Sequence, residues 1–182
     1  MSKIRKENIL SIFGILFLGT VTFGSQLHIH CDWAIAYDTI SEIYEESDLV
    51  IRGTIRDSFQ LFSLDPKKIS RIKTTQFIGV KSIIKGECAP SIYINQEGGR
   101  YHLFKVTELD DYPLYRMGEE YILFLRKIGD NKYISLGSPQ GSYKVIDGKV
   151  YSVLEIVNMV GDPELSTNGT EVNLFMDLIV QD

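Results

Sequence analysis

Residues 49–56 alternate between apolar and polar side chains, and this pattern constrains the fold more than any other in the chain. Leu49, Ile51 and Ile55 fall in one phase, whereas Arg52 and Arg56 fall in the other. Successive side chains of a β-strand point to opposite faces, so a period of two predicts a strand with one buried face. We take this segment as the first strand of an all-β domain.

Similar patterns follow, separated by short turns. Further strands are expected at residues 71–84, 91–95, 121–125, 133–136, 141–146 and 149–153. Residues 101–106 form either another strand or the start of a long loop. The apolar run 121–125 is typical of a central strand that is buried on both faces. Asp147-Gly148 favours a two-residue type I′ hairpin, because both positions accept positive φ.

Two helices are expected at the ends of this series. Residues 38–46 place Ile40, Ile43 and Tyr44 at helical spacing, and the stretch after Thr170, its expected N-cap, repeats that spacing. The chain is therefore predicted to be mainly β, an OB-like closed barrel of about five strands with a short N-terminal helix and a C-terminal helix.

The N-terminus has the composition of a secretory signal. Lys3, Arg5 and Lys6 precede an apolar stretch at residues 9–23, which is shorter than the roughly 20 residues of a membrane-spanning helix. We expect residues 1–25 to be a signal peptide, 26–37 a tether and 38–182 the OB-like domain. The protein is then secreted or extracellular; with an uncleaved leader it is instead membrane-anchored and faces outside.

The charge of the chain argues against nucleic acid as a partner. The formal net charge is −5, and removal of residues 1–25 takes away three basic and one acidic side chain, which leaves −7. Binding to a phosphate backbone depends on clustered cations.

The only two cysteines, Cys31 and Cys88, either form one disulfide or remain two thiols. A disulfide closing this long loop would stabilise the fold by about 3 to 4 kcal/mol.

Short motifs of the chain resemble a known family. Cys31 is followed by a short helix and by Ser47-Asp-Leu-Val-Ile-Arg52, and Ile83-Ile-Lys-Gly86 ends a long strand. This arrangement is similar to the netrin-like, OB-related domain of tissue inhibitors of metalloproteinases and of related bacterial secreted proteins. The resemblance implies an OB barrel. In the inhibitors a mature N-terminal cysteine chelates the protease zinc and a second cysteine follows two residues later, whereas here Asp32 and Trp33 follow Cys31.

The residues that could carry catalysis or bind metal are few. His28, His30, Cys31 and Asp32 are metal-binding residue types, but structural zinc takes four well-spaced ligands and only His102 remains to complete a set. A nucleophilic centre would also depend on His102, and no Gly-x-Ser-x-Gly motif is present. Adjacent carboxylates such as Glu119 and Glu120 point apart on a strand and are usually solvated in a turn, so they are not expected to form a shared site. We expect no enzymatic activity, no cofactor and no metal.

The best candidates for a binding surface lie between residues 98 and 116. They are residue types that are enriched at interfaces: Arg100, Tyr101, His102, Tyr112, Tyr115 and Arg116. The alternative is that these aromatic side chains pack beneath a long loop. We therefore expect a secreted, non-enzymatic module that binds an extracellular protein or envelope component. The alternatives are an extracellular protease inhibitor that acts through the Cys31 end, or a membrane-anchored envelope protein.

Overall fold

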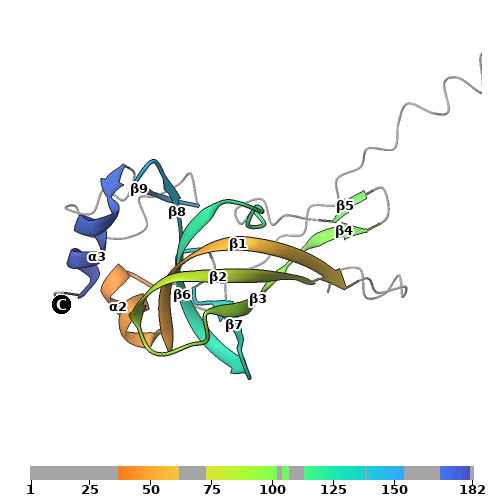
Figure 1. Ribbon diagram of the computed structural model, residues 1–182, viewed down its shortest axis with the longest axis horizontal. Coiled ribbons are helices and arrows are strands. Elements are labelled where there is room, and N and C mark those ends of the chain that lie inside the picture. The colour runs from red at the N-terminus through yellow and green to blue at the C-terminus, as the bar shows by residue number, and fades with distance from the viewer. Residues whose placement is uncertain are drawn as a thin grey trace, which may run out of the picture.

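The computed structural model describes residues 37–61, 73–101, 104–106, 113–137, 139–153 and 169–180. In chain order the helices and strands are α2 (Ile40–Glu46), β1 (Leu49–Leu61), β2 (Lys73–Lys85), β3 (Ser91–Glu97), β4 (Gly99–Tyr101), β5 (Phe104–Val106), β6 (Glu120–Gly129), β7 (Lys132–Ser135), β8 (Ser142–Ile146), β9 (Lys149–Ser152), β10 (Thr170–Glu171) and α3 (Val172–Val180). Figure 1 shows α2 and α3 at one end of the molecule, while the long ends of β1 and β2 reach toward the other.

Five strands close the barrel. β1 pairs with β2, β2 with β3, and β6 with both β7 and β1, and all these pairs are antiparallel. β3 and β7 pair in parallel. The circular order β1-β2-β3-β7-β6-β1 leaves no gap in the barrel. The prediction of an OB-like closed barrel of about five strands, with one helix before it and one after it, is confirmed.

β6 belongs both to the barrel and to the part of the same sheet that extends beyond it. Its first half lies between β1 and β8, and its second half pairs with β7. β8 continues into β9 and β10, so the sheet extends beyond the barrel. Tyr121, Ile122, Leu123, Phe124 and Leu125 are all buried. This confirms that the apolar run 121–125 is a strand covered on both faces.

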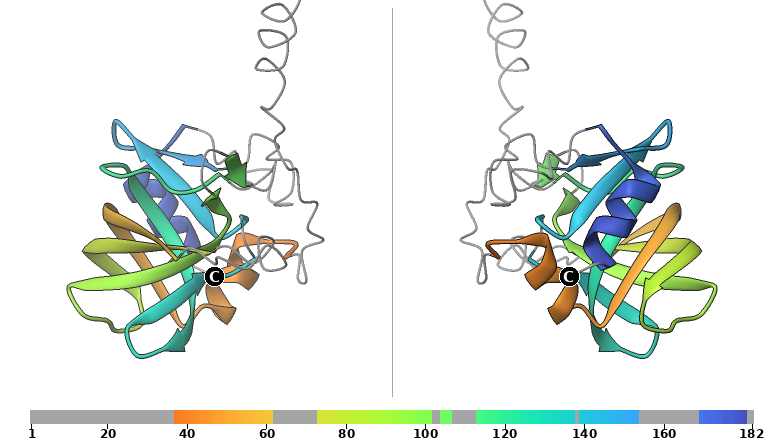
Figure 2. Two further views of the ribbon diagram at one scale, coloured as in Figure 1. Left: turned by 90° about the vertical axis from the view of Figure 1, so that its right-hand side faces the viewer. Right: turned by 90° about the vertical axis from the view of Figure 1, so that its left-hand side faces the viewer.

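The two faces of β6 contribute to two separate cores. The barrel interior is filled mainly by aliphatic side chains from β1, β2, β3 and β6, among them Ile51, Ile78, Ile94 and Leu123. The second core lies outside the barrel, where Val50, Ile122 and Phe124 meet α2, α3, β8 and β9. Figure 2 shows α3 beside the β8–β9 hairpin in both side views. The terminal helices therefore cover one outer face of the barrel.

Local signals explain how α2 starts and stops. The Thr39 side chain accepts a hydrogen bond from the Glu42 backbone N–H at 3.2 Å, and Glu42 accepts one from the Asp38 backbone N–H at 2.9 Å. Thr39 is thus the N-cap, and Glu42 reaches back to the N–H one residue before the cap, which is a variant of the capping box. At the other end, the Ser47 hydroxyl donates to the Ile43 carbonyl at 2.6 Å. Side-chain hydrogen bonds are therefore made at both ends of α2, and β1 begins three residues after the helix ends.

The hairpin at Asp147-Gly148 is also confirmed. These residues have φ of 50° and 76°, and β8 and β9 pair on either side of them. Both left-handed conformations match the type I′ turn that the Asp-Gly pair favours.

The structure corrects some element boundaries. Residues 101–106 do not form one strand, because β4 and β5 fold back on each other as a small hairpin. Thr170 is in β10, where it pairs with Val150, and is not the N-cap of α3. The Val172 backbone N–H donates to the Gly148 carbonyl at 2.9 Å, so α3 begins directly after this strand pairing.

The predicted leader and most of the predicted tether lie outside the described residues. Tyr37, the last residue of the tether, is buried in the helix-covered core and so packs with the domain. Neither helix in the described part of the chain has the length and apolar character needed to cross a membrane.

Candidate functional site

The outer surface of β1, β2 and β3 carries a group of aromatic side chains away from the helices. We use the name aromatic face for the outward side chains of Asp57, Phe59, Thr75, Phe77, Tyr93 and Asn95. Strand alternation sets this arrangement. Ile78, Ile92 and Ile94 are buried in the barrel, so their neighbours in sequence, Phe77 and Tyr93, point outward.

The aromatic side chains meet because of the strand register. Phe77 lies directly opposite Tyr93, and their ring centroids are 5.3 Å apart with the planes inclined by 42°. Phe59 is opposite Thr75, which makes it a diagonal neighbour of Phe77 across the β1–β2 pair. Phe59 is 50 % exposed and Tyr93 is 37 % exposed. The three strands therefore present a patch of aromatic surface to solvent.

Polar groups border the rings. The Thr75 hydroxyl donates to the Asn95 side-chain oxygen at 2.9 Å. Lys73 and Glu97 form an ion pair of 2.8 Å across the next row of the same strands. Asp57 accepts a hydrogen bond from the Ser58 backbone N–H at 2.8 Å. The face thus combines aromatic rings with hydroxyl, amide and paired charged groups.

β3 is held in place below this face. The Tyr93 backbone N–H donates to the Asn131 carbonyl at 3.0 Å, and the Asn131 side-chain amide donates to the Ser91 carbonyl at 2.9 Å. The β6–β7 turn is thereby fixed to the start of β3. The backbone that carries Tyr93 is supported on both sides, which suits a preformed binding surface.

The structure places the sequence-predicted surface residues in different surroundings. Arg100 and Tyr101 lie in β4, close to the end of β3. Arg116 is exposed, in the segment that leads into β6. His102 and Tyr112 lie outside the described residues. Only the side chains of Tyr115 and Arg116 are described, so the predicted surface as a whole stays a prediction.

Tyr115 corrects the predicted surface directly, because it is only 4 % exposed and belongs to the barrel core. Its backbone N–H donates to the Gln96 side-chain oxygen at 2.9 Å, and its carbonyl accepts from the Gln76 amide at 3.1 Å. Its hydroxyl is 2.6 Å from the Ser142 hydroxyl. The prediction that Tyr115 lies on a binding surface is therefore wrong, because its ring packs inside the barrel core.

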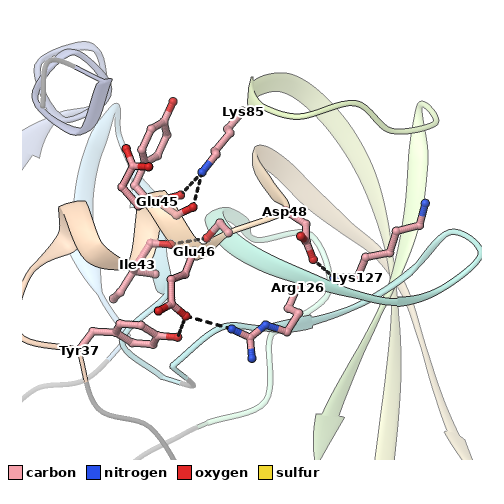
Figure 3. Close-up of polar contacts among 10 residues, drawn as sticks. Tyr37, Ile43, Glu45, Glu46, Asp48, Lys85, Arg126 and Lys127 are labelled. Atoms are coloured by element: carbon pink, nitrogen blue, oxygen red, sulfur yellow. Dashed lines mark hydrogen bonds and ion pairs between the residues drawn. The ribbon is translucent and has the colours of Figure 1, made fainter.

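A second polar group lies at the helix end of the barrel (Figure 3). Glu46 accepts hydrogen bonds from the Tyr37 hydroxyl at 2.9 Å and from Arg126 at 3.2 Å. Lys85 donates to the carbonyls of Tyr44 and Glu45 at 2.5 and 2.7 Å, and it lies over the Tyr44 ring. These contacts hold α2 against the strands. They satisfy the last carbonyl groups of the helix.

The chain enters the domain at this same end. The Gln140 side chain accepts from the Tyr37 backbone N–H at 3.0 Å and donates to the Tyr37 carbonyl at 2.9 Å. Gly137 allows the Tyr37 ring to pack closely, because a Cβ there would lie 2.7 Å from that ring. Tyr37 is therefore a fixed point, six residues after Cys31.

The Cys88 side chain packs partly against the barrel core, and no other cysteine lies in the described part of the chain. Burial raises the pKa of this thiol, which disfavours the reactive thiolate. Cys31 lies outside the described residues, so the disulfide between the two remains a prediction. The metal-binding residue types at His28, His30 and Asp32 also lie outside them. Over the residues that are described, no three His, Cys, Asp or Glu side chains gather as a metal site would require.

Glu119 and Glu120 take part in separate ion pairs, as expected for adjacent carboxylates. Glu119 accepts from Lys144 and Tyr121 at 2.6 Å each, whereas Glu120 contacts both Arg52 and Lys81. Burial alone would raise the pKa of each carboxyl, but the hydrogen bonds and positive charges outweigh it and lower both pKa values. Both groups are therefore charged at neutral pH and act as structural anions.

Comparison with known proteins identifies no relative. No protein-family model matches the chain, and no curated protein is significantly similar to it. The function must therefore be argued from the residues and their geometry.

Proposed function

We propose that this protein is a secreted, non-catalytic binding module of the netrin-like OB class, and that the aromatic face is its binding surface. The ligand would be an extracellular protein or a component of the cell envelope. The single observation that carries this proposal is the exposure of Phe59 and Tyr93 beside Phe77 on neighbouring strands. Aromatic side chains of this kind contribute much of the free energy of binding at interfaces.

The position of this face on the barrel supports the proposal. β1, β2 and β3 are the first three strands of the OB-like barrel. In other OB folds the face of strands 2 and 3 and the adjoining loops bind oligonucleotides and oligosaccharides. This is an analogy between folds, and the residues on the face must supply the specificity.

The pKa shifts of two tyrosines and two glutamates fit structural roles, as the proposal requires of these groups. Burial raises the pKa of Tyr143 and, together with a hydrogen bond to Glu119, that of Tyr121. Both phenols therefore keep their protons at neutral pH. Glu119 and Glu120 have lowered pKa values, and a general acid would need the opposite shift.

Photo-crosslinking in the cells that export the protein tests the binding surface. A diazirine amino acid is placed at position 59 or 93, with position 174 as the matched control, because Leu174 is an exposed residue on α3 (53 %). We expect covalent adducts from positions 59 and 93 but not from 174. Diazirines insert into proteins and glycans alike, so the result does not depend on the ligand. Equal yields at the three positions, or no adduct at 59 and 93, would refute the proposal.

The anchoring of Tyr37 favours a second candidate, inhibition of an extracellular protease by the Cys31 end. Six extended residues span at most about 20 Å, which bounds the distance from Tyr37 to Cys31. N-terminal sequencing of the exported protein separates the candidates. A mature chain that begins at Cys31 supports inhibition, one that begins near Ser25 or Gln26 supports the plain secreted module, and an intact leader supports an anchored protein.

The same geometry is compatible with a Cys31–Cys88 disulfide. The turn that contains Cys88 begins against the residue that precedes β1, because a Cβ on Gly86 would be 2.4 Å from the Asp48 carbonyl oxygen. Alkylation of the unfolded exported protein without reductant tests the bond. We expect no alkylated cysteine, and two alkylated cysteines would show that the thiols are free.

A further inference from the structure

The aromatic face has nearly balanced charge, which restricts the class of ligand. Its rows contain or border on two acidic residues, Asp57 and Glu97, and three basic ones, Arg56, Lys73 and Lys132. Lys73 and Glu97 neutralise each other at 2.8 Å. A polyanion needs several uncompensated cations. With that pair cancelled, Asp57, Arg56 and Lys132 remain, which is too few cations for a polyanion and leaves an uncharged ligand as the better fit.

The chemistry around the rings narrows the class further. The hydrogen bond that the Thr75 hydroxyl donates is accepted by the side-chain oxygen of Asn95. It does not use the N–H donors of the Asn95 amide. Lys132 lies opposite Tyr93 across the parallel β3–β7 pair and is exposed. Aromatic faces with amide, hydroxyl and ammonium groups at their border match a sugar ring, which has an apolar C–H face and a rim of hydroxyl groups.

From these observations we infer that the ligand of the aromatic face is a neutral oligosaccharide. The inference rests on the proposed function and names the ligand class for that site. Phe77 and Tyr93 provide the ring pair on which a sugar stacks, and Phe59 lies diagonally beside them to meet the next sugar. Thr75 and Asn95 lie in the adjacent row, where the hydroxyl groups of the glycan would be within reach.

The layout of the face fits an extended chain. The strands of a sheet are about 4.8 Å apart, so side chains on β1, β2 and β3 form a row that crosses the strands at this spacing. The ring centroids of Phe77 and Tyr93 are separated by 5.3 Å, which is comparable to the rise per sugar in an extended β-linked glycan. A linear glycan can therefore lie across the strands and contact more than one ring.

Isothermal titration calorimetry on the purified exported protein tests this inference. The probes are cellohexaose, chitohexaose and maltohexaose, and hexagalacturonate is the anionic control. We expect at least one neutral probe to bind more tightly than hexagalacturonate. Tyr93→Ala should weaken that binding by at least about tenfold, as truncation of a central aromatic contact does. Tyr93→Phe keeps the ring and should retain binding.

Leu174→Ala is the matched control, because Leu174 is exposed on a different surface; it should bind like the unmodified protein. Urea unfolding of Tyr93→Ala must show a folded protein for the comparison to count, and Phe59→Ala provides a second variant of the face. Failure of all three neutral probes, stronger binding of hexagalacturonate, or unchanged binding by both face variants overturns the inference. If position 93 still crosslinks to a protein, the proposed binding surface survives and only the ligand class is wrong.

Discussion

The two ends of β1 carry apolar side chains on the outside of the barrel, but they meet different surroundings. Val50, near the start of the strand, is fully buried beneath the helix-covered core. Phe59, near its other end, is half exposed beside Phe77 and Tyr93. Figure 1 shows that the helices lie only at the first of these ends. The fold thus covers the outer face that contains Val50, here called the covered face. It leaves the aromatic face exposed to solvent, and this is the open face.

Because of this difference, the covered face contributes to the stability of the fold and the open face is available for binding. Apolar side chains on a covered face contribute to the free energy of folding, because burial removes them from water. Exposed aromatic side chains contribute little to folding and remain available to a ligand. Substitutions on the covered face should therefore change stability, whereas those on the open face should change binding.

The largest effect is expected for Phe175→Ala on the covered face. Phe175 is fully buried, and its ring centroid is 5.0 Å from that of Tyr143. Loss of a buried phenylalanine side chain should lower the free energy of unfolding by about 3 to 5 kcal/mol. Urea unfolding followed by circular dichroism measures this. A loss below about 1 kcal/mol would show that α3 does not hold the covered face in place.

A smaller effect is expected at the boundary between the two faces. Glu120 contacts Arg52 and Lys81 there, so Glu120→Gln should lower the free energy of unfolding at neutral pH by about 1 to 2 kcal/mol.

The lowered pKa values of Glu119 and Glu120 also predict that stability depends on pH. A carboxyl with a lowered folded-state pKa stabilises the fold above its unfolded pKa of about 4.5, and this contribution is lost as the pH falls through the folded-state value.

Urea unfolding at a series of pH values checks both statements. The unmodified protein should lose stability as the pH falls below about 4.5, and the slope should be smaller in Glu120→Gln. Glu97→Gln is the control for an exposed ion pair and should change little. Equal slopes in Glu120→Gln and the unmodified protein would contradict the assignment.

Lys85→Met tests how α2 is held over the covered face. The substitution keeps the apolar stem but removes the ammonium group that donates to two helix-end carbonyls. We expect a loss of about 1 kcal/mol in the free energy of unfolding. Lys149→Met, on β9, changes the charge equally at a residue with no such helix-capping contact and serves as the control. Equal losses in the two variants would exclude a capping role for Lys85.

The smallest change in stability is expected on the open face. Phe59→Ala combined with Tyr93→Ala should lower the free energy of unfolding by less than about 1 kcal/mol, since it removes cross-strand contacts but creates no buried cavity. Urea unfolding measures this against Phe175→Ala. A loss as large as that of Phe175→Ala would mean that the aromatic face is part of the structural core.

Much of the fold could be predicted because the relevant signals are local. Alternation in residues 49–56, the apolar run 121–125 and the Asp147-Gly148 turn each determine their structure over a few residues. The ends of strands were harder to predict, because β1 and β3 are extended by pairing with β2. Thr170 was misassigned for the same reason, since its pairing with Val150 is a long-range contact.

The candidate site was harder to predict than the fold. Tyrosine is a residue type that is enriched at interfaces, and this led to the prediction for Tyr115. Hydrogen bonds from Gln76 and to Gln96 instead hold the Tyr115 backbone inside the barrel. Phe77 and Tyr93 each occupy the outward phase of their strands, and an aromatic residue in that phase on two successive strands is a detectable signal. Their contact, however, depends on the β2–β3 register, which the geometry of the connecting turn sets together with the alternation of each strand.

The most direct test of the open face is hydroxyl-radical footprinting of the protein, purified and in its exported setting. Mass spectrometry would compare the oxidation of Phe59 and Tyr93 with that of Leu174, which is exposed on α3. If the aromatic face binds a ligand, Phe59 and Tyr93 will be oxidised readily in the purified protein and protected in the exported setting, while Leu174 reacts equally in both. Equal oxidation of Phe59 and Tyr93 in the two settings would contradict the claim that this face is a binding surface.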